Sequence, residues 1–273
     1  MYANVSPPVM KLIKVILISL VVYLLAFGLA MAQDQLTLPL SRPGQPGTLS
    51  VELVRGSITV QGYLGQEVII QTDAPGEGHE SSTPGGLRRL TGQPLDLEAT
   101  EDDNQVRVKV RIPSKQTRLM VQVPTNFSVR ARTVNNGRLR IKDVAGEVEA
   151  TNVNGDIYLE GLSGSAVANT VNGRLEIRFD GVTPDTPMAF TSLNGDVDVT
   201  FPEDTPMTVK MKTLNGEVYT DFDLTIGPSN GDASDPRKIY RVRMNKEITG
   251  DINGGGPVVR LKNHNGNIFL RKQ

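Results

Sequence analysis

The sequence predicts an all-β protein, a single-chain β-solenoid with two short strands in each coil of about 18–22 residues. Three observations support this fold. A glycine stands at every ninth position along one stretch of the chain, at Gly137, Gly146, Gly155, Gly164 and Gly173. Each glycine precedes a short segment in which apolar and polar residues alternate, the pattern of a turn followed by a strand. No amphipathic helix pattern follows residue 33, so strands alone are expected there.

Asparagine–glycine pairs occur in every second unit and set the length of one coil. In this stretch they begin at Asn136, Asn154 and Asn172, evenly spaced at twice the glycine period. Residue i of one coil is therefore expected beside residue i+18 of the next. The inward positions then form two columns: Leu139, Ile157 and Leu175, and Ile141, Leu159 and Ile177. Both columns contain only isoleucine and leucine, as a buried sheet face requires.

The outward positions of the same register alternate in charge from coil to coil. Two columns read cation, anion, cation: Arg138, Asp156 and Arg174, and Lys142, Glu160 and Arg178. Strands about 4.8 Å apart bring such side chains close enough for opposite charges to attract. Each exposed pair contributes only about 0.5 kcal/mol, so the pattern supports the register more than it stabilises the fold.

Strand patterns also flank the repeat. Those before it lie at residues 51–60, which read as two strands around Gly56, and at 67–71, 95–99, 106–112 and 118–123. We expect these N-terminal strands to cap one end of the solenoid. The Asn-Gly pattern continues to the C-terminus, so the last strand, residues 268–270, is expected to be a sheet edge at the other end. The charges of Arg271 and Lys272 beside it would either discourage further pairing, which is the favoured interpretation, or mark a docking edge for a partner strand.

The N-terminal residues have the pattern of a secretory signal peptide. Lys11 and Lys14 precede an apolar run at residues 15–31, and Ala-Met-Ala at 30–32 is a small-residue cleavage signature. If it is not cleaved, the run approaches the length of a membrane anchor. The predicted organisation is a signal peptide (1–32) with a signal helix, a linker (33–48), and a β-solenoid domain (49–273) with a flexible insertion rich in glycine, proline and serine (72–94).

Composition restricts the classes of partner and site. The chain has no cysteine, which excludes disulfides, thiolate chemistry and a lipid-attachment cysteine. The formal net charge is −1 at pH 7, and loss of Lys11 and Lys14 with the signal peptide makes it more negative. A near-neutral chain without a basic tract argues against nucleic acid as a partner. No cofactor and no metal site is predicted, and membrane contact is expected only through an uncleaved N-terminal segment.

The order of the motifs resembles a known family. The segment VELVRGSITVQGYLGQEVIIQT is followed by LMVQVPTNFSVRARTVNNGRLRI, by the stacked Asn-Gly strands, and finally by INGGG and NGNIFLRK. Together they resemble the bacterial β-strand-repeat proteins grouped as a "putative adhesin" family of unknown function, over roughly residues 49–273. The resemblance implies a β-solenoid on an exported protein. It implies no catalytic or binding residues.

The column of Asn-Gly asparagines has two interpretations. Asn154, Asn172, Asn194 and Asn215 form either a row of exposed amides that bind a glycan or another strand, or a set of turn residues whose stacked amides bond to one another. The second is favoured, because Asn and Gly supply the positive φ of tight turns whatever the partner.

Metal and catalytic sites are not strongly indicated. The glycine period is that of the calcium-binding parallel β-roll, but the aspartates of that repeat are missing, which leaves isolated ions at 101–103 or 232–235 as the alternatives. A carboxylate pair among Asp156, Glu160 and Glu176 would suit a polysaccharide lyase or hydrolase. Each has arginine or lysine neighbours in the predicted register, however, and His79 and His264 form no triad with a plausible serine.

The sequence therefore favours an exported, non-enzymatic interaction module of the cell envelope or cell surface, adhesin-like, located in the periplasm, at the surface or outside the cell. It would bind a protein or polysaccharide through a flat solenoid face. The alternatives are a carbohydrate-active enzyme on a β-helix and a structural or stress-signalling protein of the envelope. The candidate interaction face consists of Arg138, Arg140, Asp156, Tyr158, Arg174 and Glu176.

Overall fold

The computed structural model describes residues 35–73, 97–110, 116–135, 137–183, 185–225 and 247–273. The chain divides into two compact units, Met1–Gln35 and Leu36–Gln273, and the strands of the solenoid belong to the second. The predicted signal peptide, nearly all of the predicted insertion and the candidate ion site at 232–235 lie outside the described residues. Within the described ranges, no helix has the length and apolar character needed to cross a membrane.

Every regular element in the described ranges is a β-strand, as predicted. The strands are β1 (Gln35–Pro39), β2 (Thr48–Tyr63), β3 (Glu67–Asp73), β4 (Leu97–Asp102), β5 (Gln105–Val110), β6 (Thr117–Pro124), β7 (Ser128–Asn135), β8 (Leu139–Lys142), β9 (Val148–Asn154), β10 (Ile157–Leu162), β11 (Ala166–Asn172), β12 (Leu175–Phe179), β13 (Met188–Asn194), β14 (Val197–Phe201), β15 (Met207–Lys212), β16 (Val218–Thr220), β17 (Ile248–Ile252), β18 (Val258–Asn265) and β19 (Ile268–Lys272).

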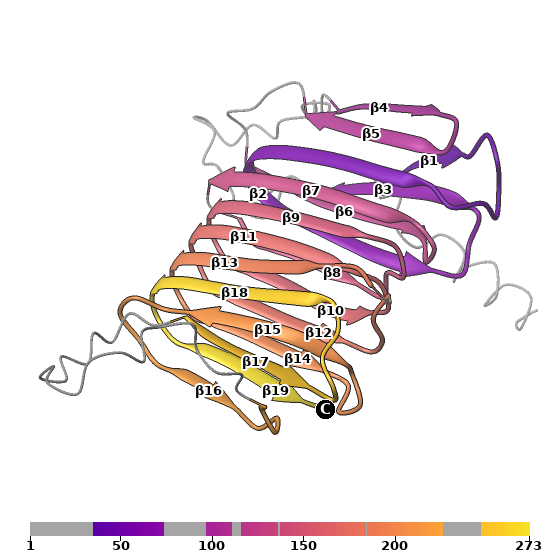
Figure 1. Cartoon of the computed structure of the whole chain (residues 1–273). Helices are drawn as coiled ribbons and strands as arrows, with labels where there is room; N and C mark the ends of the chain where they lie inside the picture. Colours follow the sequence, from indigo (N-terminus) through magenta and orange to yellow (C-terminus); the bar gives the residue numbers. More distant parts are fainter. Residues whose placement is uncertain (1–34, 74–96, 111–115, 136, 184, 226–246) are drawn as a thin grey trace, which may run out of the picture. The chain divides into compact units, whose positions relative to one another are not determined.

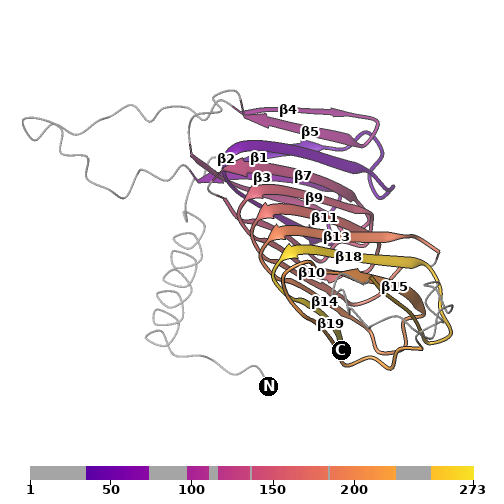
Figure 2. The ribbon, with the colours of Figure 1, turned by 60° about the vertical axis from the view of Figure 1, so that its left-hand side comes forward.

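From β5 to β16 successive strands alternate between two sheets that face each other across the core, and two strands make one coil (Figure 1 and Figure 2). Sheet A runs β3–β6–β2–β8–β10–β12–β14–β19–β16. Sheet B runs β4–β5–β2–β7–β9–β11–β13–β18–β15–β17. All of these pairs are parallel except β3–β6, β4–β5 and β15–β17 near the ends. The predicted solenoid with two short strands per coil is therefore the observed fold.

The predicted register of the core is confirmed. Ile157 lies between Leu139 and Leu175 in sheet A, and Leu159 between Ile141 and Ile177. All six side chains are no more than 1% exposed. The next coil is longer, with Val197 beside Leu175, because the turn between β12 and β13 contains more residues. The variation in coil length thus follows from the turn lengths, while the inward columns stay aliphatic.

The C-terminal strand is not a sheet edge, and that prediction was wrong. The coil β18–β19 inserts between the coil β13–β14 and the coil β15–β16, although β15 and β16 come earlier in the chain (Figure 1). β19 has a strand on each side, and among the described strands the outermost at this end are β16 in sheet A and β17 in sheet B. The sequence period did not reveal this, because every coil carries the same inward pattern.

The N-terminal end has a similar insertion. β2 lies between β5 and β7 in sheet B and between β6 and β8 in sheet A. The two strands expected around Gly56 form one long strand that passes from sheet B to sheet A at this glycine, where φ is 119°. The predicted linker contains β1, and Leu40 after it is buried.

The corners between the sheets are held by a buried polar column, which the sequence did not lead us to expect. Its side chains each donate to the carbonyl of a corner glycine on a neighbouring coil: Thr133 to Gly56, Asn152 to Gly137, Thr170 to Gly155, Ser192 to Gly173, Asn263 to Gly195 and Thr213 to Gly266. The donor–acceptor distances run from 2.8 to 3.1 Å. Five of these side chains are buried and Thr213 is half-buried. The bonds satisfy corner carbonyls that the turns would otherwise leave unpaired.

Candidate interaction faces

The predicted interaction residues lie together on the outer face of sheet A. Tyr158 of β10 stands in register between Arg140 of β8 and Glu176 of β12. Arg138, Asp156 and Arg174 occupy the positions before these strands and form the adjacent column. The parallel register with alternating inward and outward side chains brings all six to one surface.

Tyr158 is the centre of this group. The guanidinium carbons of Arg138 and Arg140 lie 5.9 and 5.4 Å from the centroid of its ring, within cation–π range. Its hydroxyl donates to Asp156 Oδ2 at 3.2 Å. Burial raises the pKa of the Tyr158 phenol, and the neighbouring Asp156 carboxylate raises it further. The phenol therefore stays protonated at neutral pH and keeps its hydrogen bond.

The predicted charge columns are only partly ion-paired. Lys142 and Glu160 pair at 2.6 Å, and the hydrogen bond from Lys142 lowers the pKa of Glu160. Asp156 Oδ1 instead accepts from the backbone N–H of Arg174 at 2.9 Å. The Arg174 guanidinium pairs with Asp198 at 3.0 Å and lies 4.0 Å from Glu176.

Asp198 joins this face to a second group of residues, of which the sequence singled out only Arg271, as a charge beside the last strand. Its nearly buried carboxylate also pairs with Arg271 of β19 at 2.8 Å. Arg271 lies over the ring of Phe269, with its guanidinium carbon 5.0 Å from the centroid. Phe269 stacks on Tyr219 of β16 with the centroids 5.1 Å apart and the planes at 10°. Phe269 and Tyr219 are distant in the chain and meet only because β19 inserts beside β16.

The carboxylates that would serve an enzyme are engaged in structural contacts. Asp156, Glu160 and Glu176 have the partners described above. A polar hollow of about 710 Å³ lies where the strands of sheet A end, and Asp143, Glu160 and Asp221 are among the residues that line it. Asp143 accepts from Gln61 at 2.6 Å and Asp221 from the Lys272 backbone at 2.7 Å. In the described part of the chain, no group of three or more His, Asp or Glu is placed to hold a metal ion.

The residues of the candidate ion site at 101–103 bind the turn that joins β1 to β2. Glu101 accepts hydrogen bonds from the backbone N–H of Ser41 at 3.0 Å, from the Ser41 hydroxyl at 2.8 Å, and from the backbone N–H of Asn104 at 2.9 Å. Asp103 pairs with Arg42. The hydrogen bonds to Ser41 lower the pKa of Glu101 below its usual range.

The lowered pKa of Glu101 predicts acid sensitivity of this turn. A depressed folded-state pKa stabilises the fold above the unfolded pKa, and this contribution is lost as the pH falls through the folded pKa, from about pH 5 downward. Glu101→Gln should therefore flatten the pH dependence of the unfolding free energy, measured by denaturant unfolding between pH 3 and 7. Glu98→Gln, an exposed change on the same strand, is the control. Parallel profiles for Glu101→Gln and the wild type would contradict this role.

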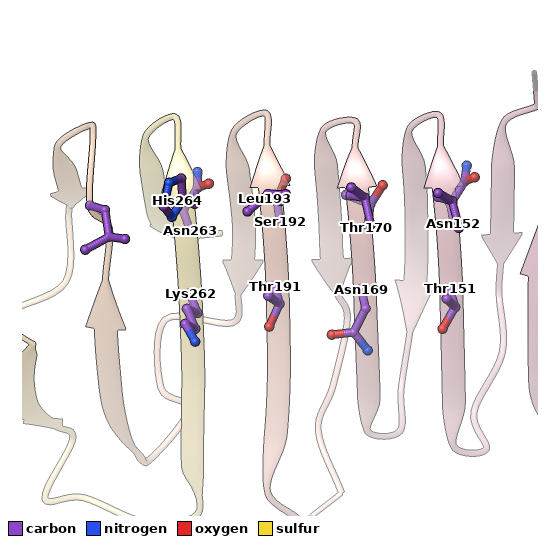
Figure 3. A pocket seen from close by; sticks show the side chains of 13 residues that line it. Thr151, Asn152, Asn169, Thr170, Thr191, Ser192, Leu193, Lys262, Asn263 and His264 are labelled. Atoms are coloured by element: carbon purple, nitrogen blue, oxygen red, sulfur yellow. The ribbon is translucent and has the colours of Figure 1, made fainter. Parts of the chain in front are cut away.

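The outer face of sheet B carries a groove of about 450 Å³. Thr151, Asn169, Thr191 and Lys262 lie at one level on β9, β11, β13 and β18 (Figure 3). Aliphatic side chains line it at the next outward position of the strands: Val153, Val171, Leu193 and Leu214, with His264 between the last two. The buried Asn152 and Asn263 also line the groove, and their Oδ1 atoms accept no hydrogen bond from the described residues.

The asparagine column runs beside this groove as a ladder of amides. Each Nδ2 donates to the Oδ1 of the neighbouring coil in the order Asn154 to Asn135, Asn172 to Asn154, Asn194 to Asn172, Asn265 to Asn194 and Asn215 to Asn265. The distances are 2.7–3.0 Å. The expected stacking of the amides is confirmed, with Asn265 inserted between Asn194 and Asn215. The expected positive φ is found at the glycines Gly155, Gly195 and Gly266 and at none of these asparagines. Asn136 lies outside the described residues.

Comparison with solved structures finds the same fold elsewhere. A structure named "putative cell adhesion protein", from Clostridium sporogenes ATCC 15579, has a TM-score of 0.51 and 8% identity, covering 88% of this chain and all of that one. At this identity the likeness shows the fold alone. A structure named "putative adhesin", from Bacteroides fragilis NCTC 9343, has a TM-score of 0.34 and 9% identity, covering 88% of this chain and 96% of that one.

Sequence comparison identifies the family. No curated protein matches the chain. The family model described as Toastrack DUF4097 matches residues 124–271, which is more than half of the chain and extends from the end of β6 into β19. These residues contain the stacked coils, their glycine corners and the amide ladder. The chain therefore belongs to the Toastrack DUF4097 family.

Proposed function

We propose that this protein is an exported, non-enzymatic interaction module of the cell envelope or cell surface. It binds a protein or polysaccharide through the flat outer face of sheet A, by many contacts spread over several coils. The signal-peptide pattern of residues 1–32 supports export. The solved structure of the same fold is named "putative cell adhesion protein", and a surface-interaction role agrees with that name.

The observation that carries this proposal is the arginine–aromatic surface of sheet A. Tyr158 with Arg138 and Arg140 forms one cluster, and Tyr219, Phe269 and Arg271 form the other. Tyrosine and arginine are enriched at the binding surfaces of proteins and contribute most of the hot-spot energy. Both clusters are fixed by contacts within the sheet, so little side-chain entropy remains to be lost on binding.

The test is binding of the purified protein to envelope fractions and to a panel of polysaccharides. The double variant Arg140→Ala/Tyr158→Ala should bind at least about tenfold more weakly, because it removes two anchors of one cluster. The matched control is Arg107→Ala with Ser50→Ala, which changes outward residues of sheet B. Equal weakening in the control contradicts the assignment of the face. Turnover of a polysaccharide by the wild type contradicts the non-enzymatic function.

A further inference from the structure

Sheet B carries a cluster of four like charges on two neighbouring strands, which we call the basic quartet: Lys210 and Lys212 of β15, and Arg260 and Lys262 of β18. Lys210 stands directly beside Arg260, and Lys212 directly beside Lys262. Parallel neighbours are about 4.8 Å apart, and like charges in that position repel each other. In sheet A, by contrast, the facing residues Lys142 and Glu160 have opposite charges and form an ion pair.

The quartet forms no ion pair with any of the described residues. On its other side, β13 places Ala189 beside Arg260 and Thr191 beside Lys262. The neighbouring β17 carries Asp251, whose Oδ1 accepts from the Thr208 hydroxyl at 2.7 Å, and Glu247 lies directly before that strand. Glu247 lies beside Lys212 in the antiparallel register of β15 and β17, but neither acid forms an ion pair with the quartet. Neighbouring like charges without ion pairs destabilise a fold, and such departures from the rules of stability are expected at functional sites.

The groove of sheet B continues directly from the quartet. Lys262 belongs to both, and His264 follows at the next outward position of β18. The aliphatic lining is exposed, with Val171 38%, Leu193 43% and Leu214 38% accessible. By register Val171 lies beside Leu193 and Leu193 beside His264. Figure 3 shows Leu193 and His264 next to the level of Thr151, Asn169, Thr191 and Lys262. A row across five strands is about 20 Å long, the reach of about six residues of extended chain.

We propose that the quartet and the groove together bind an acidic segment of a partner polypeptide. Its carboxylates meet the four cations, and its aliphatic side chains lie along the row that ends at Leu214. The aliphatic lining favours a peptide over a glycan, because no Phe, Tyr or Trp among the described residues lines the groove for a sugar to stack on. A membrane surface is disfavoured because the exposed amide ladder beside the groove would lose its hydration there.

This site is on the opposite sheet from the face of the proposed function, and the two are tested separately. The probe is a fluorescent synthetic peptide in which four glutamates precede four aliphatic residues, added to the full protein in an anisotropy titration. The double variant Lys212→Gln/Lys262→Gln should bind this peptide at least about tenfold more weakly and with a smaller salt dependence. A peptide with lysines in place of the glutamates should not bind.

The controls separate loss of the site from loss of the fold. Arg178→Gln on sheet A should bind the peptide as the wild type does. Thermal unfolding of the double variant should be unchanged or shifted upward, because the substitutions remove repulsion. Unchanged peptide affinity in the double variant overturns the proposal. Binding of polygalacturonate or of phosphatidylglycerol vesicles, without binding of the peptide, also overturns the proposal.

Discussion

Removal of residues 247–273 is expected to abolish the cooperative unfolding transition of the solenoid, although it removes only the C-terminal tenth of the chain. The deletion takes out the coil β18–β19 from between β13–β14 and β15–β16. It also removes Val259, Leu261, Ile268 and Leu270 from the core, where each is fully buried. At about 1.5–3 kcal/mol for each side chain, the loss is about 6–12 kcal/mol, comparable with the whole stability of a typical domain. Thermal denaturation followed by circular dichroism measures it.

Two point variants provide a matched control for this deletion. Val259→Ala changes a residue of β18 that lies between Met188 and Val209, whereas Val218→Ala makes the same change on the edge strand β16. Val259→Ala should cost about 2–3 kcal/mol and Val218→Ala less than half of that, because Val218 is only half buried and has a strand on one side. A coil order that followed the chain would give the reverse ranking, and that result would contradict the insertion.

Gly195→Ala is expected to destabilise the protein by about 3 kcal/mol or more. Gly195 adopts a φ of 134°, which non-glycine residues rarely adopt. A Cβ on this residue would lie 2.2 Å from the carbonyl oxygen of Gly173 on the neighbouring coil. Backbone strain and overpacking each cost about 1–3 kcal/mol, and here the obstacle is backbone that cannot rotate away. Denaturant unfolding of the purified variant measures the change.

Gly181→Ala is the control for this substitution. Its Cβ would meet only atoms of Ser163 at 3.9–4.0 Å, which is ordinary contact, and its φ is not in the left-handed region. The unfolding free energy should change by less than about 1 kcal/mol. Similar losses in the two variants would show that the stacked corners do not have the steric role assigned to them.

The stacked coils were predictable because their determinants are local. The columns that contain Leu139, Ile157 and Leu175 follow from a fixed spacing between turns, and the turns follow from Asn-Gly pairs. The common location of Arg138, Tyr158 and Glu176 on one face follows from the same register. Their partners were less predictable. The charge columns suggested that Asp156 would pair with arginine side chains, but its oxygens accept from a backbone N–H and a tyrosine hydroxyl.

The basic quartet and the aromatic stack lay beyond sequence reasoning. Lys210 and Arg260 are distant in the chain, as are Tyr219 and Phe269. No fixed sequence spacing relates the members of these pairs, because residues 226–246, which lie outside the described ranges, separate the coil β15–β16 from the coil β18–β19 along the chain. In the sequence alone, each of the two segments is a short strand of alternating apolar and polar residues with two outward cations, which is a common pattern. Only their adjacency in sheet B makes the cluster unusual.

By itself the sequence determined the strand length, the coil length, the glycine corners and which side chains face the core. Only the tertiary structure decided the order in which the coils stack. The physical reason is that neighbouring coils pair through backbone hydrogen bonds and through aliphatic columns that every coil shares. Val209 and Val259, or Met211 and Leu261, occupy equivalent inward positions. The local pattern is therefore satisfied by more than one order, and the order becomes visible only in the strand pairing of the folded chain.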